Sequence, residues 1–215
     1  MTHVIAMLGQ IGLVPVVKLD RAADAVPLGQ ALIAGGLPCA EITFRTAAAA
    51  EAIGLLANAC PDLLLGAGTV LTVEQAELAV DAGARFIVSP GFSPAVVDWC
   101  LHRGVPVIPG VVTPTELMVA LDKGLNILKF FPAEAYGGIA TLKALSAPFG
   151  GVKFMPTGGV SAKNLAEYLS LPSVHAVGGS WMVEGKLIAS GNFAEVTRLA
   201  AEARAIVRQT RGEQG

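Results

Sequence analysis

The sequence has little charge, few aromatic residues and few cysteines, and each shortage excludes a class of protein. Charged residues make up 15% of the 215 positions and leave a formal net charge of −2 at pH 7. No excess of basic residues therefore draws the chain to nucleic acid. Three cysteines, Cys39, Cys60 and Cys100, form an odd number and lack the CxxC spacing of a zinc site. We expect reduced, buried thiols and no nucleic-acid partner.

The sequence also lacks a membrane-spanning run and a basic leader. Its longest apolar stretch, Val4 to Val17, is interrupted by glycines, a glutamine and a proline and is too short to cross a bilayer. No cluster of Lys or Arg precedes that stretch, as a secretory signal would require. We therefore expect a cytoplasmic protein with no membrane contact.

Several catalytic motifs are missing. The three histidines, His3, His102 and His175, are scattered without the HxH or HExxH spacing of a metal site. The chain has no GxSxG elbow of a serine hydrolase and no GxGxxG dinucleotide fingerprint after the first expected strand. We therefore expect no metal site, no serine-hydrolase triad and no dinucleotide site of this kind.

What the sequence does have is a repeat of short apolar runs, each followed by an Ala- and Leu-rich stretch of helical periodicity. The spacing of about 20 to 26 residues suits one strand and one helix. Candidate strands begin near Val14, Cys39, Leu63, Arg85, Val105, Asn126, Val152 and Val174. These are eight successive strand–helix units.

Residues typical of helix starts and helix ends support the count of eight units. Thr72–Gln75 and Thr113–Glu116 have the pattern of capping boxes, and Ser93 precedes a proline where a helix should begin. Gly83, Gly104 and Gly124 stand where those helices should end. We predict an α/β fold, a single (β/α)₈ TIM barrel over residues 1–215, with a short helix over residues 1–12. An open doubly wound sheet is the alternative.

Polar residues at the carboxyl ends of the strands are the candidates for chemistry in such a barrel. In the second strand, the two-residue period puts Glu41, Thr43 and Arg45 on one face and apolar residues on the other. The polar face is expected to point into the barrel. Glu41 and Arg45 could form a buried structural pair or a functional one.

A single lysine interrupts the apolar sixth strand, in the segment Asn126–Pro132. Burial disfavours the charged form of an amine, so Lys129 could serve as a nucleophile that forms a Schiff base with a ketone. Alternatively, Lys129 extends to solvent from the strand end or pairs structurally with Glu41.

Two glycine pairs follow the seventh and eighth strands, Gly158–Gly159 and Gly178–Gly179. Glycines let backbone N–H groups approach phosphate oxygens, and a helix amino terminus at such a loop adds partial positive charge. We expect a phosphate site here. Gly66–Thr69 ends the third strand in a similar way and adds a hydroxyl group to the same mouth.

Seven segments together closely resemble the 2-keto-3-deoxy-6-phosphogluconate (KDPG) aldolases, a class I aldolase family. The resemblance extends from Val14 to about Phe193. The segments are Glu41–Thr46, Gly66–Val70, Ser89–Gly91, Pro109–Glu116, Lys129–Glu134, Pro156–Gly159 and Gly178–Trp181.

The resemblance implies cleavage of KDPG to pyruvate and glyceraldehyde 3-phosphate, without a metal or cofactor. By match to the family's motifs, Lys129 is the Schiff-base lysine and Glu41 the general base. Arg45 and Thr69 would bind the pyruvate carboxylate. Cleavage of 4-hydroxy-2-oxoglutarate and assembly as a homotrimer are also implied.

The same match assigns the rest of the substrate site. Pro90 and Phe131 would line the pyruvate end, and Thr157 would contact the C4 hydroxyl group. The phosphate group would lie against Gly158, Gly159, Gly179 and Ser180.

Two other functions stay open. One is the related 2-keto-3-deoxy-6-phosphogalactonate aldolase, which acts on the C4 epimer. The other is a phosphosugar isomerase or epimerase, in which Glu41 is the base and Lys129 acts only electrostatically. A catalytically silent phosphate-binding protein ranks below both, since it would give Lys129 no purpose.

Overall fold

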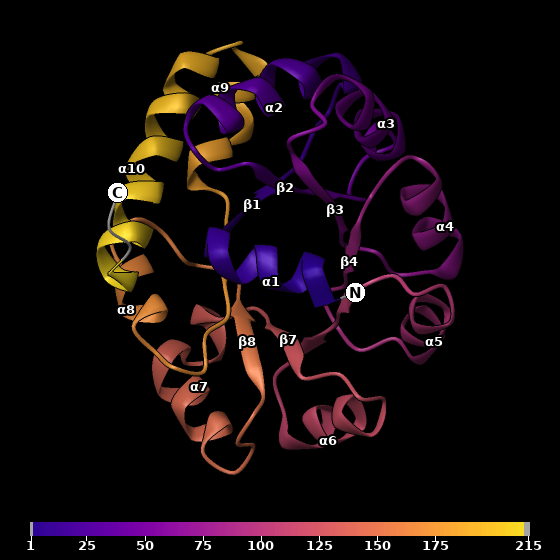
Figure 1. The fold of residues 1–215 in the computed structure, drawn as a ribbon, viewed down its shortest axis with the longest axis vertical. Coiled ribbons are helices and arrows are strands. Elements are labelled where there is room, and N and C mark those ends of the chain that lie inside the picture. Colours follow the sequence, from indigo (N-terminus) through magenta and orange to yellow (C-terminus); the bar gives the residue numbers. More distant parts are fainter. Residues whose placement is uncertain (1, 213–215) are drawn as a thin grey trace.

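Parallel strands alternate with helices along the chain, and the helices lie around the outside of the strands (Figure 1). The computed structural model describes residues 2–212. The strands are β1 (Leu13–Val17), β2 (Cys39–Thr43), β3 (Leu64–Gly68), β4 (Phe86–Val88), β5 (Val107–Ile108), β6 (Gly110–Val111), β7 (Ile127–Phe130), β8 (Lys153–Pro156) and β9 (Val177–Gly179).

Ten α-helices and three short 3₁₀ helices connect or flank the strands in the described range. The α-helices are α1 (Thr2–Ile11), α2 (Ala25–Ala34), α3 (Ala49–Ala59), α4 (Val73–Asp81), α5 (Pro94–His102), α6 (Pro114–Asp122), α7 (Gly138–Ser146), α8 (Leu165–Leu169), α9 (Gly185–Ala189) and α10 (Phe193–Arg211). The 3₁₀ helices are η1 (Ala22–Asp24), η2 (Glu134–Tyr136) and η3 (Trp181–Val183).

All strand pairs are parallel, so the predicted α/β class is confirmed. The ladder is divided into a six-stranded sheet, β5-β4-β3-β2-β1-β9, and a three-stranded sheet, β6-β7-β8. The predicted continuous ladder of eight strands is therefore not found in this form. Pro109 separates β5 from β6, since proline has no N–H to donate. Between β8 and β9 only two isolated bridges form, Phe154 with Val174 and Thr157 with Gly178.

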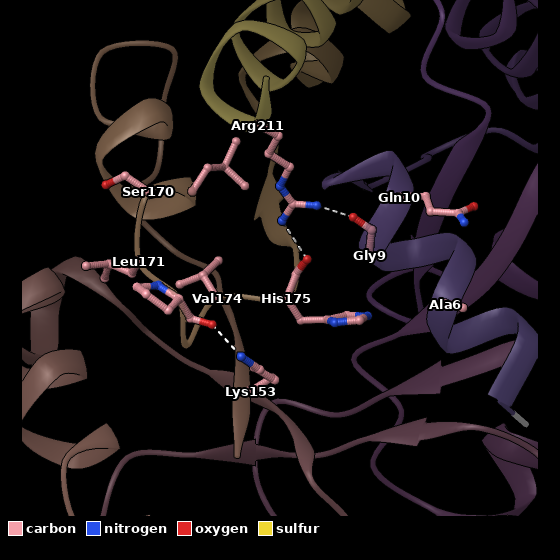
Figure 2. Close-up of a pocket in the computed structure, with 11 residues that line it drawn as sticks. Ala6, Gly9, Gln10, Lys153, Ser170, Leu171, Val174, His175 and Arg211 are labelled. Atoms are coloured by element: carbon pink, nitrogen blue, oxygen red, sulfur yellow. Dashed lines mark hydrogen bonds between the residues drawn. The ribbon is translucent and has the colours of Figure 1, made fainter. Parts of the chain in front are cut away.

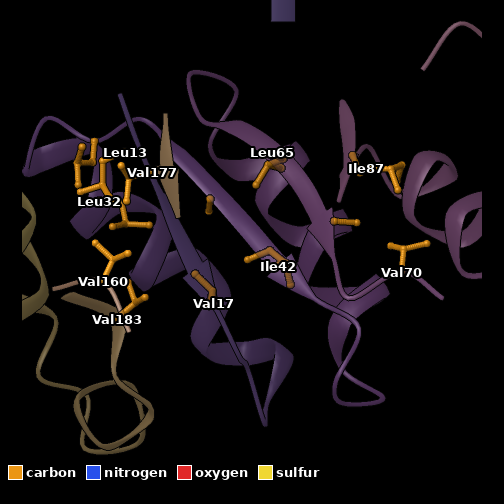
Figure 3. Packing of buried hydrophobic residues seen from close by; sticks show 14 of the residues in the cluster. Leu13, Val17, Leu32, Ile42, Leu65, Val70, Ile87, Val160, Val177 and Val183 are labelled. Carbon is orange, nitrogen blue, oxygen red and sulfur yellow. The ribbon is translucent and has the colours of Figure 1, made fainter. Parts of the chain in front are cut away.

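Each strand begins within three residues of the predicted position, and the fifth is divided in two. The side chains then separate by the two-residue period of a strand. Residues such as Leu13, Val17, Ile42, Leu65 and Ile87 face the helices and form the larger hydrophobic cluster (Figure 3).

The opposite strand faces enclose a second hydrophobic cluster. Its members are Leu8, Val14, Cys39, Leu64, Phe86, Val88, Ile108, Met155 and Ala176. Most of the strand residues in this cluster stand at or near the amino ends of their strands. Leu8 belongs to α1 and packs among them, so α1 lies across that end of the sheet (Figure 1). The predicted amino-terminal helix is thus present over residues 2–11. Met1, the first residue of that prediction, lies outside the described residues.

The carboxyl-terminal helix α10 holds α1 in place (Figure 2). Arg211 donates hydrogen bonds to the Gly9 carbonyl and, at 2.7 Å, to the His175 carbonyl. The His175 ring lies 2.8 Å from the Ile5 carbonyl oxygen. The last carbonyls of a helix have no partner within it, so Arg211 satisfies the Gly9 carbonyl, which α1 itself cannot. A cavity of about 560 Å³ opens beside them.

The predicted helix ends are largely confirmed. Thr113 and Glu116 form a complete capping box at the start of α6. At α4, Thr72 accepts from the Gln75 N–H, whereas the Gln75 side chain accepts from Leu71 instead of closing the box. The three glycines expected after α4, α5 and α6 all have positive φ angles.

Three further findings concern the cysteines, membrane-spanning helices and metal sites of the described residues. Cys39, Cys60 and Cys100 are free and buried, as expected. Within residues 2–212, no helix combines the length and apolarity needed to cross a bilayer. No group of three or more His, Cys, Asp or Glu residues in that range is placed to hold a metal ion.

Candidate active site

The interior face of β2 carries a buried carboxylate. Ala40 and Ile42 pack in the outer cluster, so Glu41 and Thr43 point to the opposite side, as the period predicts. Glu41 is completely buried, and the Thr43 hydroxyl group donates to the Val17 carbonyl at 2.8 Å. β2 therefore places Glu41 among the strands and not between sheet and helix.

The interior face of β7 carries the buried amine. Leu128 and Phe130 pack outward, which turns Lys129 inward. Its Nζ lies 3.3 Å from Glu41 Oε1 and 5.3 Å from the centre of the Phe131 ring. The Lys129 side chain is 5% exposed. The structure thus pairs Glu41 with Lys129, and solvent hardly reaches the pair.

One oxygen of this pair is unsatisfied. Glu41 Oε2 is buried and has no hydrogen-bond partner in the described part of the chain. A buried carboxylate oxygen without a partner costs free energy, and such exceptions call for a functional or structural explanation. The second oxygen of Glu41 can therefore accept a further hydrogen bond.

Glycine makes room for the carboxylate. Gly68 of β3 pairs in register with Thr43 of β2, next to Glu41. A Cβ atom at Gly68 would lie 2.1 Å from Glu41 Oε1 and 2.6 Å from its Cγ. Only glycine lets the two strands approach with Glu41 in this position.

The residue after Gly68 is strained. Thr69 has a φ angle of 55°, which is rare for a β-branched residue. Strained backbone of this kind is concentrated at functional sites. Thr69 stands at the carboxyl end of β3, and Pro90 follows β4 at the same end of the sheet.

A cavity of about 460 Å³ opens at these carboxyl ends. Thr43 and Phe131 line it, each two residues beyond the buried pair on the same strand faces. Seven of the predicted site residues line this cavity together: Arg45, Phe131, Thr157, Gly158, Gly159, Gly179 and Ser180. Glu41, Lys129, Thr69 and Pro90 are not among its lining residues.

The glycine loops have the expected backbone but not the expected helix. Gly158 and Gly159 have φ angles of 99° and 79°, which favour glycine. We expected a helix to begin at this loop, but α8 starts only at Leu165. Ser161 and Asn164 form a turn in between, because the Asn164 side chain accepts from the Ser161 N–H. Ser180 directly precedes η3, a single turn of 3₁₀ helix.

Charged residues that we did not predict also line the cavity. Lys18 and Asp20, after β1, form an ion pair of 2.7 Å, and Glu184 pairs with Lys186 at the same distance. Lys18 and Asp20 follow a strand in the same way as Arg45 does. Their position just after an apolar strand could have identified Lys18 and Asp20 from the sequence.

The comparisons with known proteins agree on one family. The family model for KDPG and KHG aldolase matches residues 4–199. The chain is 53% identical to the 2-dehydro-3-deoxy-phosphogluconate aldolase of Treponema pallidum, over 96% of this chain and 99% of that protein. It is 43% identical to the KHG/KDPG aldolase of Escherichia coli K12, over 88% of this chain and 89% of that protein.

A solved structure is similar over the whole fold. The KDPG aldolase of Legionella pneumophila superposes with a TM-score of 0.88 at 46% identity, covering 93% of this chain and 96% of that one. That crystal contains pyruvate captured at low pH as a covalent carbinolamine intermediate. With a matching family model, close relatives and a shared fold, the chain belongs to the KDPG and KHG aldolase family.

Proposed function

We propose that this protein is a class I aldolase that cleaves KDPG to pyruvate and D-glyceraldehyde 3-phosphate. The observation that carries the proposal is the buried pair of Lys129 and Glu41, whose Nζ and Oε1 atoms lie 3.3 Å apart. Thr43 and Phe131, each two residues further along the chain than a member of the pair, line the cavity. A desolvated amine beside a carboxylate suits Schiff-base formation followed by proton transfer. Membership of an aldolase family supports the same reaction.

Lys129 is the nucleophile in this proposal. Its Nζ attacks the C2 carbonyl carbon of KDPG and gives a carbinolamine, which loses water to form an iminium ion. When the C3–C4 bond breaks, its electron pair moves into the iminium and produces an enamine of pyruvate. Protonation of C3 and hydrolysis by water then release pyruvate and restore the amine.

Glu41 moves the protons. Its Oε1 lies against Lys129 Nζ, so the carboxyl group can deliver the proton that leaves with water from the carbinolamine. Oε2, which has no hydrogen-bond partner among residues 2–212, can remove the C4 hydroxyl proton as glyceraldehyde 3-phosphate departs. The same group then returns a proton to the enamine carbon through water.

The pyruvate end of the substrate is assigned to residues that follow four strands, β2, β3, β4 and β7. Arg45 and the Thr69 hydroxyl group bind the carboxylate, because a guanidinium forms a charge-assisted fork with it. Pro90 and Phe131 form apolar walls. The Phe131 ring already lies 5.3 Å from Lys129 Nζ, which supports this placement.

The other end is assigned to the loops after β8 and β9. Thr157 contacts the C4 hydroxyl group. The phosphate group binds to the backbone of Gly158, Gly159, Gly179 and Ser180, which line one cavity with Thr157. We propose no metal and no organic cofactor, since an iminium supplies the electron sink.

We also propose cleavage of 4-hydroxy-2-oxoglutarate to pyruvate and glyoxylate. The family description names both KDPG and KHG aldolases, and the relative in Escherichia coli is named for both. The two substrates share the pyruvoyl end, on which Lys129, Glu41 and Arg45 would act.

The test is incubation with pyruvate and sodium borohydride, which reduces an imine to a stable secondary amine. We expect one pyruvate-derived adduct, found on Lys129 by peptide mass spectrometry. Lys129→Met should give no adduct and no turnover while it keeps the fold. Glu41→Gln should still form some adduct but cleave KDPG slowly, because the carboxylate moves protons and forms no bond.

The remaining candidates predict different results. An isomerase or epimerase should leave Lys129 of the folded protein unmodified, and that outcome would contradict the aldolase proposal. A phosphogalactonate aldolase should form the adduct but prefer the C4 epimer of KDPG. Steady-state rates on the two epimers separate these possibilities.

We further propose that the described strands act as one eight-stranded barrel in a single domain. The two bridges between β8 and β9 support closure on one side. On the other side, β5 and β6 are separated by Pro109 alone, whose carbonyl accepts from the Lys129 N–H.

We propose a cytoplasmic homotrimer. Three free, buried thiols suit a reducing compartment. Exposed apolar side chains on α6, with Met118 60%, Val119 39% and Leu121 39% exposed, suit a contact with another copy of the chain. Sedimentation analysis of the purified protein would measure the oligomeric state.

A further inference from the structure

Glu134 and Tyr168 form a contact outside the substrate cavity that the proposed reaction does not use. Glu134 opens η2, five residues after Lys129, and Tyr168 belongs to α8. The Tyr168 hydroxyl group donates a hydrogen bond to Glu134 Oε1. Tyr168 is completely buried, and burial and the Glu134 carboxylate raise the pKa of its hydroxyl group. The hydroxyl therefore stays a donor to the carboxylate.

Glu134 also supports the first glycine loop. Its backbone N–H donates to the Gly158 carbonyl at 3.1 Å, and the preceding Ala133 N–H donates to the Thr157 carbonyl at 2.8 Å. A Cβ atom at Gly159 would lie 2.5 Å from Glu134 Cγ. The Glu134 side chain thus lies directly against the backbone of Gly159.

The loop needs such support. Gly158 and Gly159 both adopt positive φ angles. Because glycine has no side chain to restrict its backbone, it populates many other φ and ψ angles as readily. Backbone N–H groups bind an anion well only when they are held in position before it arrives. Gly159 thus lies against Glu134 and also lines the substrate cavity.

We propose that Glu134 and Tyr168 are positioning residues that hold the Gly158–Gly159 loop in its phosphate-binding conformation. The proposal rests on the proposed function, since it assumes that this loop binds the substrate phosphate. The hydrogen bond to Tyr168 fixes the Glu134 side chain, and the side chain fixes the loop. Neither residue touches the substrate.

The test compares two substrates that differ in the phosphate group. In Tyr168→Phe, the KM for KDPG should rise about tenfold, the typical effect of losing a hydrogen bond to a charged group, with little change in kcat. The KM and kcat for 4-hydroxy-2-oxoglutarate, which has no phosphate, should stay within about twofold of wild type. Glu134→Gln, which keeps an oxygen acceptor for Tyr168, should rescue most of the KDPG affinity relative to Glu134→Ala.

The chain offers a matched control. Tyr136→Phe removes the hydroxyl group of an exposed tyrosine in the same η2 turn and should change neither KM. Equal losses on both substrates in Tyr168→Phe would overturn the proposal, and so would an unchanged KM for KDPG.

Two further measurements separate this proposal from the proposed function. Calorimetric titration with inorganic phosphate reports on the loop without any turnover and should show weaker binding to Tyr168→Phe. Equal phosphate affinity in both proteins would contradict the positioning role. The pyruvate adduct on Lys129 should form equally in wild type and Tyr168→Phe, because it does not depend on the phosphate loop.

Discussion

The buried carboxylate of Glu41 owes its position to the absence of a side chain on the neighbouring strand. A Cβ atom at Gly68 would overlap Glu41 Oε1, at 2.1 Å. Strand β3 pairs with β2 along five residues, so it cannot move aside at this point alone. The carboxylate would have to move instead, away from Lys129.

We therefore expect Gly68→Ala to impair catalysis more than folding. A displacement of about 1 Å of a catalytic group can lower a rate by about 100-fold, and kcat for KDPG cleavage should fall by a factor of that order. The rate of pyruvate adduct formation should fall as well. Steady-state kinetics and borohydride trapping measure the two effects.

A suitable control is Gly150→Ala, since Gly150 has open space around its Cα and no positive φ angle. It should leave kcat unchanged. Wild-type kcat in Gly68→Ala, in a protein with a normal circular dichroism spectrum, would show that Glu41 tolerates the displacement.

The sequence predicts some of these residue positions and not others. The two-residue period places Glu41 on an interior face because apolar neighbours alternate with it. Lys129 stands out because it is the single charge in an apolar strand. The two-residue period contains no information on Gly68, whose role depends on a side chain 27 positions away. The positive φ angle of Thr69 also cannot be predicted from the sequence, since threonine rarely adopts such an angle.

At the scale of single elements, the start of α6 is the best-defined helix end. Thr113 Oγ1 accepts from the Glu116 N–H at 3.3 Å, and Glu116 Oε2 accepts from the N–H groups of Val112 and Thr113 at 2.8 and 2.9 Å. These contacts satisfy donors that a helix leaves unpaired.

Thr113→Ala should destabilise the protein by about 1 kcal/mol, the typical cost of removing an N-cap side chain. For a chain of this size, the melting temperature should fall by about 2–4 °C. Thr115→Ala alters another exposed threonine of the same turn, and we expect it to change stability much less. Urea denaturation of both variants measures the difference. Equal losses of stability in the two variants would mean that the capping box adds nothing beyond helix propensity.

Elements were predictable where their signals are local. Capping residues and glycines mark α4, α5 and α6 within a few positions, because each signal acts on the adjacent turn. The division of the fifth strand at Pro109 and the late start of α8 were not predicted. The fifth strand divides at a proline, which has no N–H to donate, and the turn formed by Ser161 and Asn164 precedes α8.

For the whole molecule, the two ends of the chain meet around His175. Its ring contacts the Ile5 carbonyl of α1, and Arg211 of α10 and Lys153 of β8 place positive charge nearby. Burial is the main cause that lowers the pKa of His175 from 6.5, and the two cations add to it, while the bond to Ile5 opposes them. Gly9 allows the close approach, because a Cβ atom there would lie 2.6 Å from the ring.

This environment predicts how stability depends on pH. The unfolded chain takes up a proton on His175 as the pH falls through about 6.5, whereas the folded protein resists it until its lower pKa is reached. The stabilisation from neutral His175 is therefore complete above pH 6.5 and declines as the pH falls towards the folded pKa.

In His175→Gln, the free energy of unfolding should fall less between pH 7.5 and 5 than in wild type, because glutamine does not titrate. The glutamine amide can still donate to the Ile5 carbonyl. The variant therefore removes the titration of residue 175 and keeps its hydrogen bond to α1. His102→Gln, at an exposed position at the end of α5, should show the same pH dependence as wild type. Urea unfolding of the three proteins at several pH values gives the comparison. Parallel curves for wild type and His175→Gln would place the acid sensitivity of the fold elsewhere, away from the junction of α1 with α10.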